Sequence, residues 1–399
     1  MDLKIFTDNI EEKELEQIHT LMNQPAFADC KVRIMPDVHA GAGCVIGFTA
    51  DLGDKVIPNI VGVDIGCGML TVPLGKVDID FEKLDAVIRQ YVPSGMTVHD
   101  EPVPQFAMFD LDTLHCRYGL KNIDWIERSL GSLGGGNHFI EIDADDEGNK
   151  YLVIHTGSRN LGKQVADIWQ NAAISRMCGK EKFKEMKDKL IEDYKREGKE
   201  KLIGKALKWM KELYAPEMNV PKELCYLEGK ERDFYLDDMR FCQRFADWNR
   251  TLVARIICEH MGWNEEPKGK FSTIHNYIDH DSNIVRKGAI SAKKGERVLI
   301  PINMRDGCIV GIGKGNDDWN CSAPHGAGRI MSRAEAKKTV TMKEYEQSMQ
   351  GIFTTSVNPS TIDESPMAYK TMEEILKFIE PTVEVERIIK PVYNFKASE

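Results

Sequence analysis

Short runs of β-branched and other apolar residues alternate with turns that contain Gly and Asp in two parts of this 399-residue sequence. Such runs are typical of strands that lead into tight loops, and this alternation limits the fold more than any other feature. The predicted strands are residues 31–35, 45–49, 57–63, 297–302 and 308–312.

Apolar residues at helical spacing occupy much of the remaining sequence. They predict a helix within residues 1–30, one over residues 81–91 and one over residues 234–262. Residues 179–217 are rich in Lys and Glu, and we interpret them as a helical excursion on the surface rather than a dedicated binding arm. No repeat or low-complexity linker marks a domain boundary. We therefore predict a single α+β domain over residues 1–399, with central β-structure and peripheral helices.

Composition and charge exclude several classes of protein. The hydrophobic fraction of 42% and the charged fraction of 29% are typical of a globular protein. We expect no spanning helix, because a run of about 18 apolar residues is lacking. The acidic start of the sequence lacks the pattern of a signal peptide, so the expected location is cytoplasmic. A net charge of −10 argues against a general nucleic-acid coat protein.

Five of the ten histidines lie in loops that contain Gly, Asn or Pro, a setting that positions side chains for chemistry. They are His39, His138, His155, His275 and His325. The other five lack comparable surroundings, and we expect surface or structural roles for them.

Asp64 and Cys67 lie three residues apart in the Gly-rich segment VGVDIGCGM. A carboxylate and a potential thiolate at this spacing can bind one cation or bridge two. Alone, the pair favours a buried Cys in a Gly-rich turn, but together with three histidines in similar loops it favours a metal site. By ligand softness the first choice is zinc, although the absence of a CxxC pair argues against a zinc ribbon or finger.

His325 precedes Gly-Ala-Gly and then Arg329 and Arg333. If a helix begins at His325, the two arginines lie on one face of it. The free N–H groups of that helix start and the arginines would then form an anion site. The alternative is a helix cap with solvated arginines.

Together these segments resemble the RtcB family of RNA-splicing ligases. The resemblance rests on motifs that follow one another along nearly the whole chain. They are MPDVHAGAGCVIG (35–47), VGVDIGCGM (61–69), GGGNHFIE (134–141), HTGSR (155–159), HNY (275–277), RKGAISAKKGE (286–296), HGAGRIMSR (325–333) and a C-terminal IIKPVYNFKA.

The resemblance implies the RtcB α+β fold and a ligase that depends on GTP and Mn²⁺, in RNA repair or tRNA splicing. Such enzymes join an RNA end with a 2′,3′-cyclic phosphate or 3′-phosphate to a 5′-hydroxyl end. It implies two Mn²⁺ ions in place of zinc, bridged by Cys67. His138 and His155 would complete one metal site, and Asp64 and His275 the other.

The same resemblance implies roles for further residues. His325 would be the nucleophile that forms a histidine–GMP intermediate, and Asp37 would assist proton transfer nearby. Residues implied to contact the nucleotide phosphates are Asn137, Asn276, Ala327 and Gly328. Glu141 and Lys396 would contact the guanine, whereas Arg159, Arg329 and Arg333 would hold RNA phosphates.

The chain departs from the family pattern at a few positions. Asn303 and Cys308 stand where serines that contact guanosine are expected, and Ala42 and Ala397 replace a Lys and a Gly. These changes motivate an alternative, a metal-dependent phosphodiesterase that hydrolyses cyclic phosphates without productive guanylylation. A non-catalytic protein that binds RNA ends is a third possibility, disfavoured because the implied metal ligands and nucleophile are all present.

The positive charge is concentrated around His325. Residues 286–343 contain 12 Lys and Arg against five Asp and Glu. A basic groove on an acidic body would attract broken RNA ends while limiting indiscriminate binding. The expected partner is therefore RNA with broken ends; a helper protein is not identifiable from the sequence.

Overall fold

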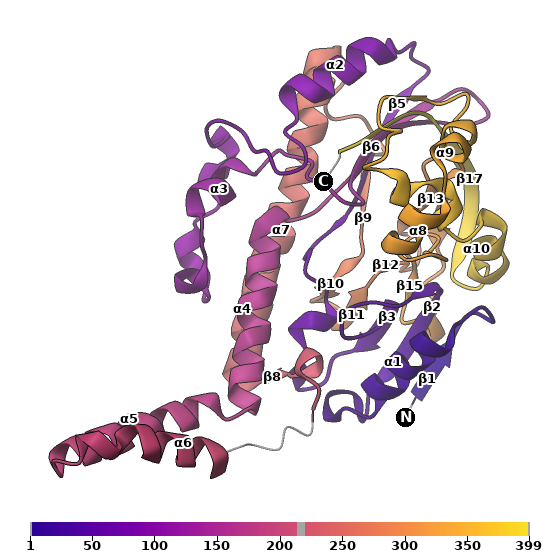
Figure 1. The fold of residues 1–399 in the computed structure, drawn as a ribbon. Helices are drawn as coiled ribbons and strands as arrows, with labels where there is room; N and C mark the ends of the chain where they lie inside the picture. Colours follow the sequence, from indigo (N-terminus) through magenta and orange to yellow (C-terminus); the bar gives the residue numbers. More distant parts are fainter. Residues whose placement is uncertain (1, 214–219, 398–399) are drawn as a thin grey trace.

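The computed structural model describes residues 2–213 and 220–397, and a long antiparallel sheet organises its upper half (Figure 1). The strand order is β13-β14-β17-β6-β7-β5-β9, and β16 pairs in parallel with β17. The first and last strands of this order also contact each other, so the sheet curls into a near barrel. Its strands are β5 (Gly68–Gly75), β6 (Phe139–Ala144), β7 (Lys150–Thr156), β9 (Phe271–Ile274), β13 (Arg297–Asn303), β14 (Gly307–Gly313), β16 (Phe353–Thr354) and β17 (Val383–Lys396).

A second sheet has the order β1-β2-β3-β11-β10 and lies below the first in Figure 1. It joins an N-terminal segment to a segment from the second half of the chain. Its strands are β1 (Asp2–Ile5), β2 (Lys31–His39), β3 (Ile46–Asp51), β10 (Asn276–Asp279) and β11 (Ile284–Lys287). Short pairs are formed by β12 (Ala289–Ser291) with β15 (Ser322–Pro324), and by β4 (Lys55–Val56) with β8 (Leu227–Glu228).

Helices surround the sheets, which confirms the predicted α+β class. The longest, α7, lies alongside α4 and packs on β7 and β5 (Figure 1). The helices are α1 (Glu12–Met22), α2 (Phe81–Tyr91), α3 (Ile123–Arg128), α4 (Arg159–Met177), α5 (Lys180–Arg196), α6 (Ile203–Leu213), α7 (Gly229–Met261), α8 (Arg333–Thr339), α9 (Met342–Ser348) and α10 (Met372–Ile379). Among the described residues, none of these helices has the length and apolar character needed to cross a membrane.

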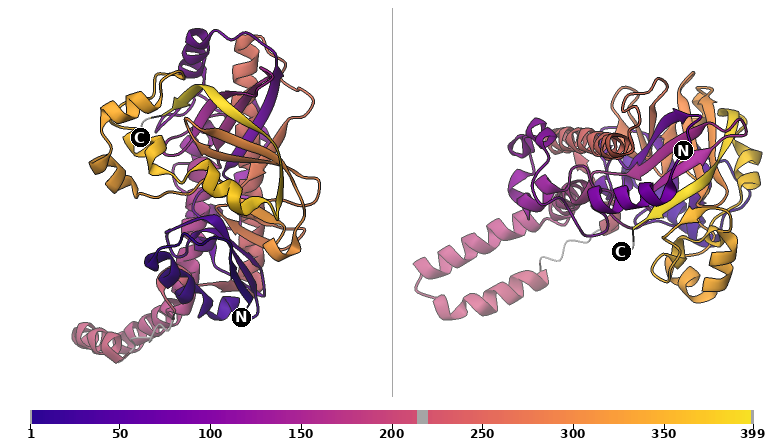
Figure 2. Two further views of the ribbon diagram at one scale, coloured as in Figure 1. Left: turned by 90° about the vertical axis from the view of Figure 1, so that its right-hand side faces the viewer. Right: turned by 90° about the horizontal axis from the view of Figure 1, so that it is seen from above.

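The helices α5 and α6 extend away from the body of the protein, as Figure 2 shows. They occupy the segment predicted as a surface excursion, of which residues 214–217 lie outside the described residues. Trp209 on α6 is 64% exposed, so this part of the chain contributes little to the core.

Most predicted elements are confirmed. The strands predicted at 31–35, 45–49, 297–302 and 308–312 fall in β2, β3, β13 and β14, and the helix over 81–91 is α2. The side chain of Asp80 caps α2 by accepting a hydrogen bond from Lys83 N at 2.9 Å.

Two parts of the N-terminal prediction need correction. The strand predicted over 57–63 is wrong, because Pro58–Ile60 is a turn of 3₁₀ helix. Pro58 suits the first position of that turn, since its fixed φ favours helical geometry and its missing N–H is not needed there. Within residues 1–30 the helix is present as α1, but Asp2–Ile5 forms β1 beside β2, because pairing with a distant strand overrides local pattern.

Two adjacent polar residues in the buried part of α7 hold loops of the first half of the chain. Asn249 and Arg250 are both fully buried. Asn249 Oδ1 accepts hydrogen bonds from Gly131 N at 2.7 Å and Ser132 N at 3.0 Å. Arg250 Nη1 donates to Gly66 O at 2.7 Å and to Thr156 O at 3.0 Å. The helix thus satisfies backbone groups that have no partner in a sheet ladder.

Replacing Asn249 by Ala should therefore destabilise the fold. We expect Asn249→Ala to lower the free energy of unfolding by about 2 to 4 kcal/mol, because buried N–H groups lose their acceptor. Denaturant unfolding followed by circular dichroism measures this loss. Asn171→Ala is the control, since Asn171 makes only an exposed bond to Asp167 O and its loss should cost under about 0.5 kcal/mol. Equal stability of the two variants would contradict the assigned role of Asn249.

Candidate functional site

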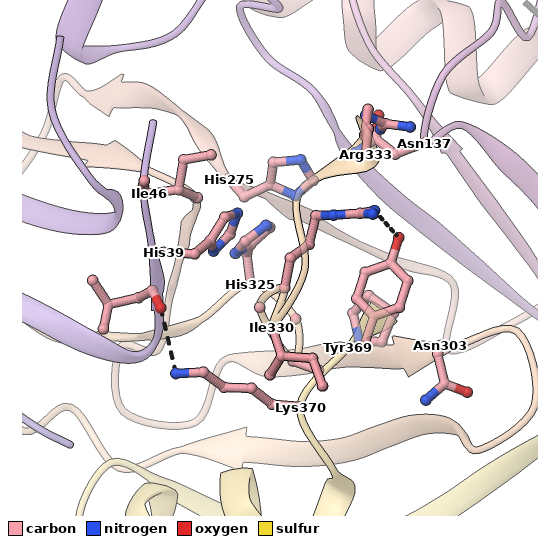
Figure 3. A pocket seen from close by; sticks show the side chains of 18 of the residues that line it. His39, Ile46, Asn137, His275, Asn303, His325, Ile330, Arg333, Tyr369 and Lys370 are labelled. Carbon is pink, nitrogen blue, oxygen red and sulfur yellow. Dashed lines mark hydrogen bonds between the residues drawn. The ribbon is translucent and has the colours of Figure 1, made fainter. Parts of the chain in front are cut away.

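A cavity of about 1090 Å³ lies between the two sheets and the segment 325–335 (Figure 3). Many of the residues singled out from the sequence line it. They are Asp64, Asn137, Glu141, His155, His275, Asn276, Asn303, His325, Ala327, Gly328, Arg329, Arg333 and Lys396. Residues separated by more than 300 positions in sequence, such as Asp64 and Lys396, therefore meet in one place.

The sulfur of Cys67 lies at the centre of a cluster of possible metal ligands. It is 3.3 Å from His155 Nε2 and 3.5 Å from His138 Nε2. His155 Nε2 is also 3.4 Å from His275 Nε2, and His138 Nε2 is 3.0 Å from Asp64 Oδ2. Among the described residues, the ligand atoms form one group of Cys67, His155 and His275 and another of Asp64, Cys67 and His138.

The grouping differs from the one implied by the resemblance, which paired His138 with His155 and Asp64 with His275. Ser158 N donates a hydrogen bond to Asp64 Oδ1 at 3.2 Å. This bond turns the other carboxylate oxygen, Oδ2, toward His138. The ligand atoms therefore group differently from the implied pairing, and Cys67 belongs to both groups.

Hydrogen bonds on the far side of two histidine rings decide which nitrogen is free. His138 Nδ1 lies 2.9 Å from Leu133 O, and His155 Nδ1 lies 3.1 Å from Asn137 O. Since a carbonyl oxygen can only accept, each Nδ1 carries the hydrogen and each Nε2 presents a lone pair. Burial, reinforced by the nearby His138 and Lys396, lowers the pKa of His155 well below its usual value and keeps the ring neutral.

The cluster therefore consists almost entirely of acceptors that face one another. Imidazole nitrogens and a carboxylate converge on a thiol that has a single weak S–H to donate, and a cation between them satisfies the remaining lone pairs. Burial, with the nearby charge of Asp64, raises the pKa of the Cys67 thiol well above its usual value. A bound cation would favour the thiolate there. The donor set fits a pair of divalent cations sharing Cys67.

Backbone pairing brings these ligands together. The strand register places His155 of β7 opposite Met69 of β5 and Phe139 of β6. Met69 lies two residues after Cys67, and Phe139 directly follows His138. His275 N donates to Cys67 O at 2.9 Å, which fixes the third segment. Asn249 and Arg250 then bind the loops that contain Gly66, Ser132 and Gly157.

His325 is held on the opposite wall by a buried carboxylate. Asp37 is fully buried, and its Oδ2 accepts hydrogen bonds from His325 Nδ1 at 2.6 Å and His325 N at 3.0 Å. Among the described residues, His325 Nε2 has no hydrogen-bond partner. The ring centroid of His325 is 5.0 Å from that of His275 (Figure 3). Gly328 has φ +78°, and a Cβ there would lie 2.3 Å from Asp37 O, so only Gly lets this loop lie on β2.

The helix predicted to begin at His325 begins later. In the structure α8 starts at Arg333, and Ser332 caps it by accepting from Glu335 N at 3.2 Å. The left-handed conformation of Gly328 interrupts any helix from His325, and Arg329 lies in the loop. The N–H groups expected to bind an anion at a helix start instead point at Asp37. That predicted anion site is therefore wrong.

Cations gather on the wall formed by the C-terminal part of the chain, around the buried carboxylate of Glu364. Lys396 Nζ and Arg333 Nη1 each lie 2.5 Å from its oxygens, and Tyr369 OH donates to it at 2.7 Å. Arg329 Nη1 lies 3.4 Å away. Burial by itself would raise the pKa of Glu364, but the charges of Lys396 and Arg333 outweigh it and lower the pKa to about 2.

The remaining predicted residues lie at the edges of this arrangement. Asn303 lines the cavity, and its Oδ1 accepts from Asp306 N at 2.9 Å. Cys308 is fully buried beside the carboxylates of Glu141 and Asp143 and does not line the cavity. Burial raises the pKa of Glu141 to about 7 although Asn394 and Lys396 oppose the shift.

Arg159 lies beside the metal loops rather than on the cavity wall. Its Nε donates to Ser132 Oγ at 3.1 Å and its Nη2 to Gly95 O at 3.4 Å. Gly134 leaves the space for this guanidinium, because a Cβ there would lie 1.6 Å from Arg159 Nη1.

The sequence analysis missed several residues that position the site. They are Asn249, Arg250, Glu364, Tyr369 and Lys370. A signal existed for the first two, since two polar residues precede the apolar stretch of a helix predicted to be buried. Glu364 and Tyr369 belong to no sequence motif. Only their contacts with Arg329, Arg333 and Lys396 in the structure reveal their role.

The low pKa of Glu364 makes stability depend on pH. Its pKa in the folded protein, about 2, lies below the ordinary 4.5, so its ionisation stabilises the fold fully above pH 4.5. That contribution, about 3 kcal/mol, is lost as the pH falls toward 2. Glu364→Gln should flatten the dependence of unfolding free energy on pH in this window and destabilise the protein at pH 7. The exposed Glu346→Gln should change neither, and a Glu364→Gln curve identical to wild type would refute the effect.

Comparison with known proteins connects this site to one family. The family model described as tRNA-splicing ligase RtcB matches residues 17–115 and 117–397. The RNA-splicing ligase RtcB of Escherichia coli is 28% identical over 401 residues, covering 92% of this chain and 90% of the relative. The tRNA-splicing ligase RtcB of Archaeoglobus fulgidus is 25% identical over 459 residues, covering 93% of this chain and 88% of the relative.

Proposed function

The chain belongs to the RtcB family of tRNA-splicing ligases, and from that premise we propose that it joins broken RNA ends with GTP and two Mn²⁺ ions. The substrates are an RNA end with a 2′,3′-cyclic phosphate or 3′-phosphate and an end with a 5′-hydroxyl, in RNA repair or tRNA splicing. The observation that carries the proposal is the free Nε2 of His325, oriented by Asp37 beside the Cys67 cluster.

His325 is suited to nucleophilic attack on the α-phosphorus of GTP. Its Nε2 supplies the electron pair, pyrophosphate leaves, and a histidine–GMP intermediate forms. The hydrogen on Nδ1 remains bonded to Asp37, whose negative charge stabilises the imidazolium produced. Asp37 therefore acts by orienting and stabilising His325, a more specific role than the proton transfer expected from the sequence.

Two transfers complete the proposed reaction on a 3′-phosphate end, and a 2′,3′-cyclic phosphate gives that end once water has cleaved its P–O2′ bond. A 3′-phosphate oxygen of the RNA attacks the phosphorus of the histidine–GMP, and the His325 Nε2 leaves. The 5′-hydroxyl of the other end then attacks the RNA 3′-phosphorus, and GMP leaves. Two Mn²⁺ ions held by Asp64, Cys67, His138, His155 and His275 would neutralise charge on the phosphate oxygens.

The cavity walls suggest how the nucleotide is held. Glu141 and Lys396 would contact the guanine; both line the cavity, and Lys396 Nζ lies 5.9 Å from the centroid of the Phe139 ring on the paired strand. Asn303 would replace one of the family's serines as a hydrogen-bond partner, whereas Cys308 would support the buried side of Glu141. The residues that would contact the nucleotide phosphates are Asn137, Asn276, Ala327 and Gly328.

RNA phosphates would be bound by Arg329 and Arg333 on the cavity wall and by Arg159 next to the metal loops. The buried carboxylates of Asp363 and Glu364 hold Arg333, and the Asp363 carbonyl oxygen and the Glu364 carboxylate hold Arg329, so little reorganisation is needed when an anion arrives.

Hydrolysis of the cyclic phosphate without guanylylation is the second candidate. It is favoured by one observation, that Asn303 and Cys308 replace residues expected to contact guanosine. Covalent labelling separates the two functions.

We expect the protein to acquire label when incubated with Mn²⁺ and GTP labelled at the α-phosphate. A phosphoramidate is stable to base and labile to acid, so the label should survive denaturation in base and be lost in acid. His325→Ala should abolish it, whereas His115→Ala, outside the cavity, should retain it. Absence of label on the wild-type protein, with hydrolysis of a 2′,3′-cyclic phosphate, would replace the ligase with the second candidate.

Cys67→Ser should remove both metal ions rather than one, because the sulfur belongs to both ligand groups. Equilibrium dialysis followed by elemental analysis gives the number of Mn²⁺ ions per chain. The matched control is Cys258→Ser, a buried Cys of α7 outside the cluster, which should retain two. Two ions on Cys67→Ser would contradict the bridging role.

A further inference from the structure

A second hollow, of about 310 Å³, opens beside the main cavity and has no part in the proposed reaction. The end of α2, the turn that contains Ser94–Met96 and the segment of Thr355 and Asn358 line it. Lys396 lines both this hollow and the main cavity, so the two are neighbours.

Arg89 is the charged group available in this hollow. Its Nε donates to Asp85 at 2.7 Å and its Nη2 to Thr355 Oγ1 at 2.5 Å, while its guanidinium lies 5.1 Å from the Phe395 ring centroid. These contacts fix the side chain, which is 49% exposed. Among the described residues Nη1 has no hydrogen-bond partner, and a fixed guanidinium with a free N–H is suited to bind an anion.

The side chains that line this hollow favour a negatively charged ligand that also carries polar groups next to its charge. Hydroxyl and amide groups of Ser94, Thr355 and Asn358 accompany Arg89, and no carboxylate is among the described residues that line the hollow. Lys396 also lines it, but its Nζ is paired with Glu364. The Asp85 carboxylate lies behind Arg89 rather than on the wall, where it binds Nε and leaves Nη1 to face the hollow.

Backbone contacts connect the hollow to the metal loops. Gly95 O, on its wall, accepts the bond from Arg159 Nη2, and Gly95 N donates to Gly134 O at 3.0 Å. Gly134 begins the loop that leads to Asn137 and His138. A strand that reaches the metal loops past Arg159 would therefore pass this turn.

We infer that this hollow binds a phosphodiester group of the RNA, at least one nucleotide away from the broken end. Arg89 Nη1 would donate to the phosphate, and the hydroxyl group of Ser94 would contact its oxygens or the ribose. The Thr355 hydroxyl already donates to Asp85 Oδ1 at 2.8 Å and helps to position Arg89 instead. A stacked base is disfavoured, because Arg89 already covers the ring of Phe395. The inference rests on the proposed function, since this hollow would be a second binding site for the same RNA substrate.

Charge changes at Met96 test this inference without removing an internal contact. Met96 lines the hollow and is 82% exposed, so substitutions there should not affect folding. Single-stranded RNA oligonucleotides with a 5′-hydroxyl end and with a 3′-phosphate end are titrated separately, by fluorescence anisotropy, between 50 and 200 mM salt. The two oligonucleotides distinguish which strand occupies the hollow.

For one of the strands, Met96→Glu should weaken binding and Met96→Lys should strengthen it, each by about fivefold. Arg89→Gln should weaken binding of that strand and reduce the slope of log K against log salt by about 0.7, the loss of one phosphate contact. The control, Arg240→Gln, removes an exposed Arg paired with Asp237 outside both hollows and should have no effect.

Three results would overturn the inference: no binding of either strand to the wild-type protein, unchanged affinity in all the variants, or a change of the same sign for Met96→Glu and Met96→Lys. Labelling of His325 by GTP is measured on the same samples and should be unaffected by these substitutions. If the protein binds the strands as expected but forms no label, the proposed ligase function is refuted, whereas RNA binding in this hollow is supported.

Discussion

The candidate site depends on the pairing of buried backbone groups by two neighbouring side chains of α7. Asn249 and Arg250 satisfy N–H and C=O groups of the loops at Gly66, Gly131, Ser132 and Gly157. These loops cannot pair in a sheet, because each must leave its strand to present a ligand. A long helix packed on the sheet supplies the missing partners, so its position and the positions of the metal ligands are coupled.

The cavity divides into two electrostatic halves. On one side, side chains suited to bind cations converge around Cys67. On the other, Arg329, Arg333 and Lys396 surround the buried Glu364. A triphosphate and an RNA terminus between these halves would meet positive charge from both sides once the metal ions are bound. Buried carboxylates hold the protein's own cations in fixed positions, which is the preorganisation expected of an enzyme that stabilises phosphoryl transfer.

Much of the local structure could be predicted because its causes are local. The helix Phe81–Tyr91 has an Asp cap and apolar residues at helical spacing, and most predicted strands were correct. The failures occur where distant contacts compete with local pattern. β1 forms only because β2 lies beside it, and the loop after His325 is not helical because Gly328 and Asp37 fix another path. The segment at Pro58 shows that β-branched neighbours do not outweigh a proline suited to a turn.

By itself, the sequence determined the residue types available for chemistry: histidines and a cysteine in Gly-bearing loops, basic residues near His325, and motifs that resemble one family. Only the tertiary structure decided how they combine. It paired Asp64 with His138 because Ser158 orients that carboxylate, and it placed Cys308 behind Glu141 rather than in the cavity. It also surrounded Glu364 with cations. The physical reason is that ligand geometry and charge pairing depend on distances of a few ångströms between segments far apart in sequence, and packing alone sets those distances.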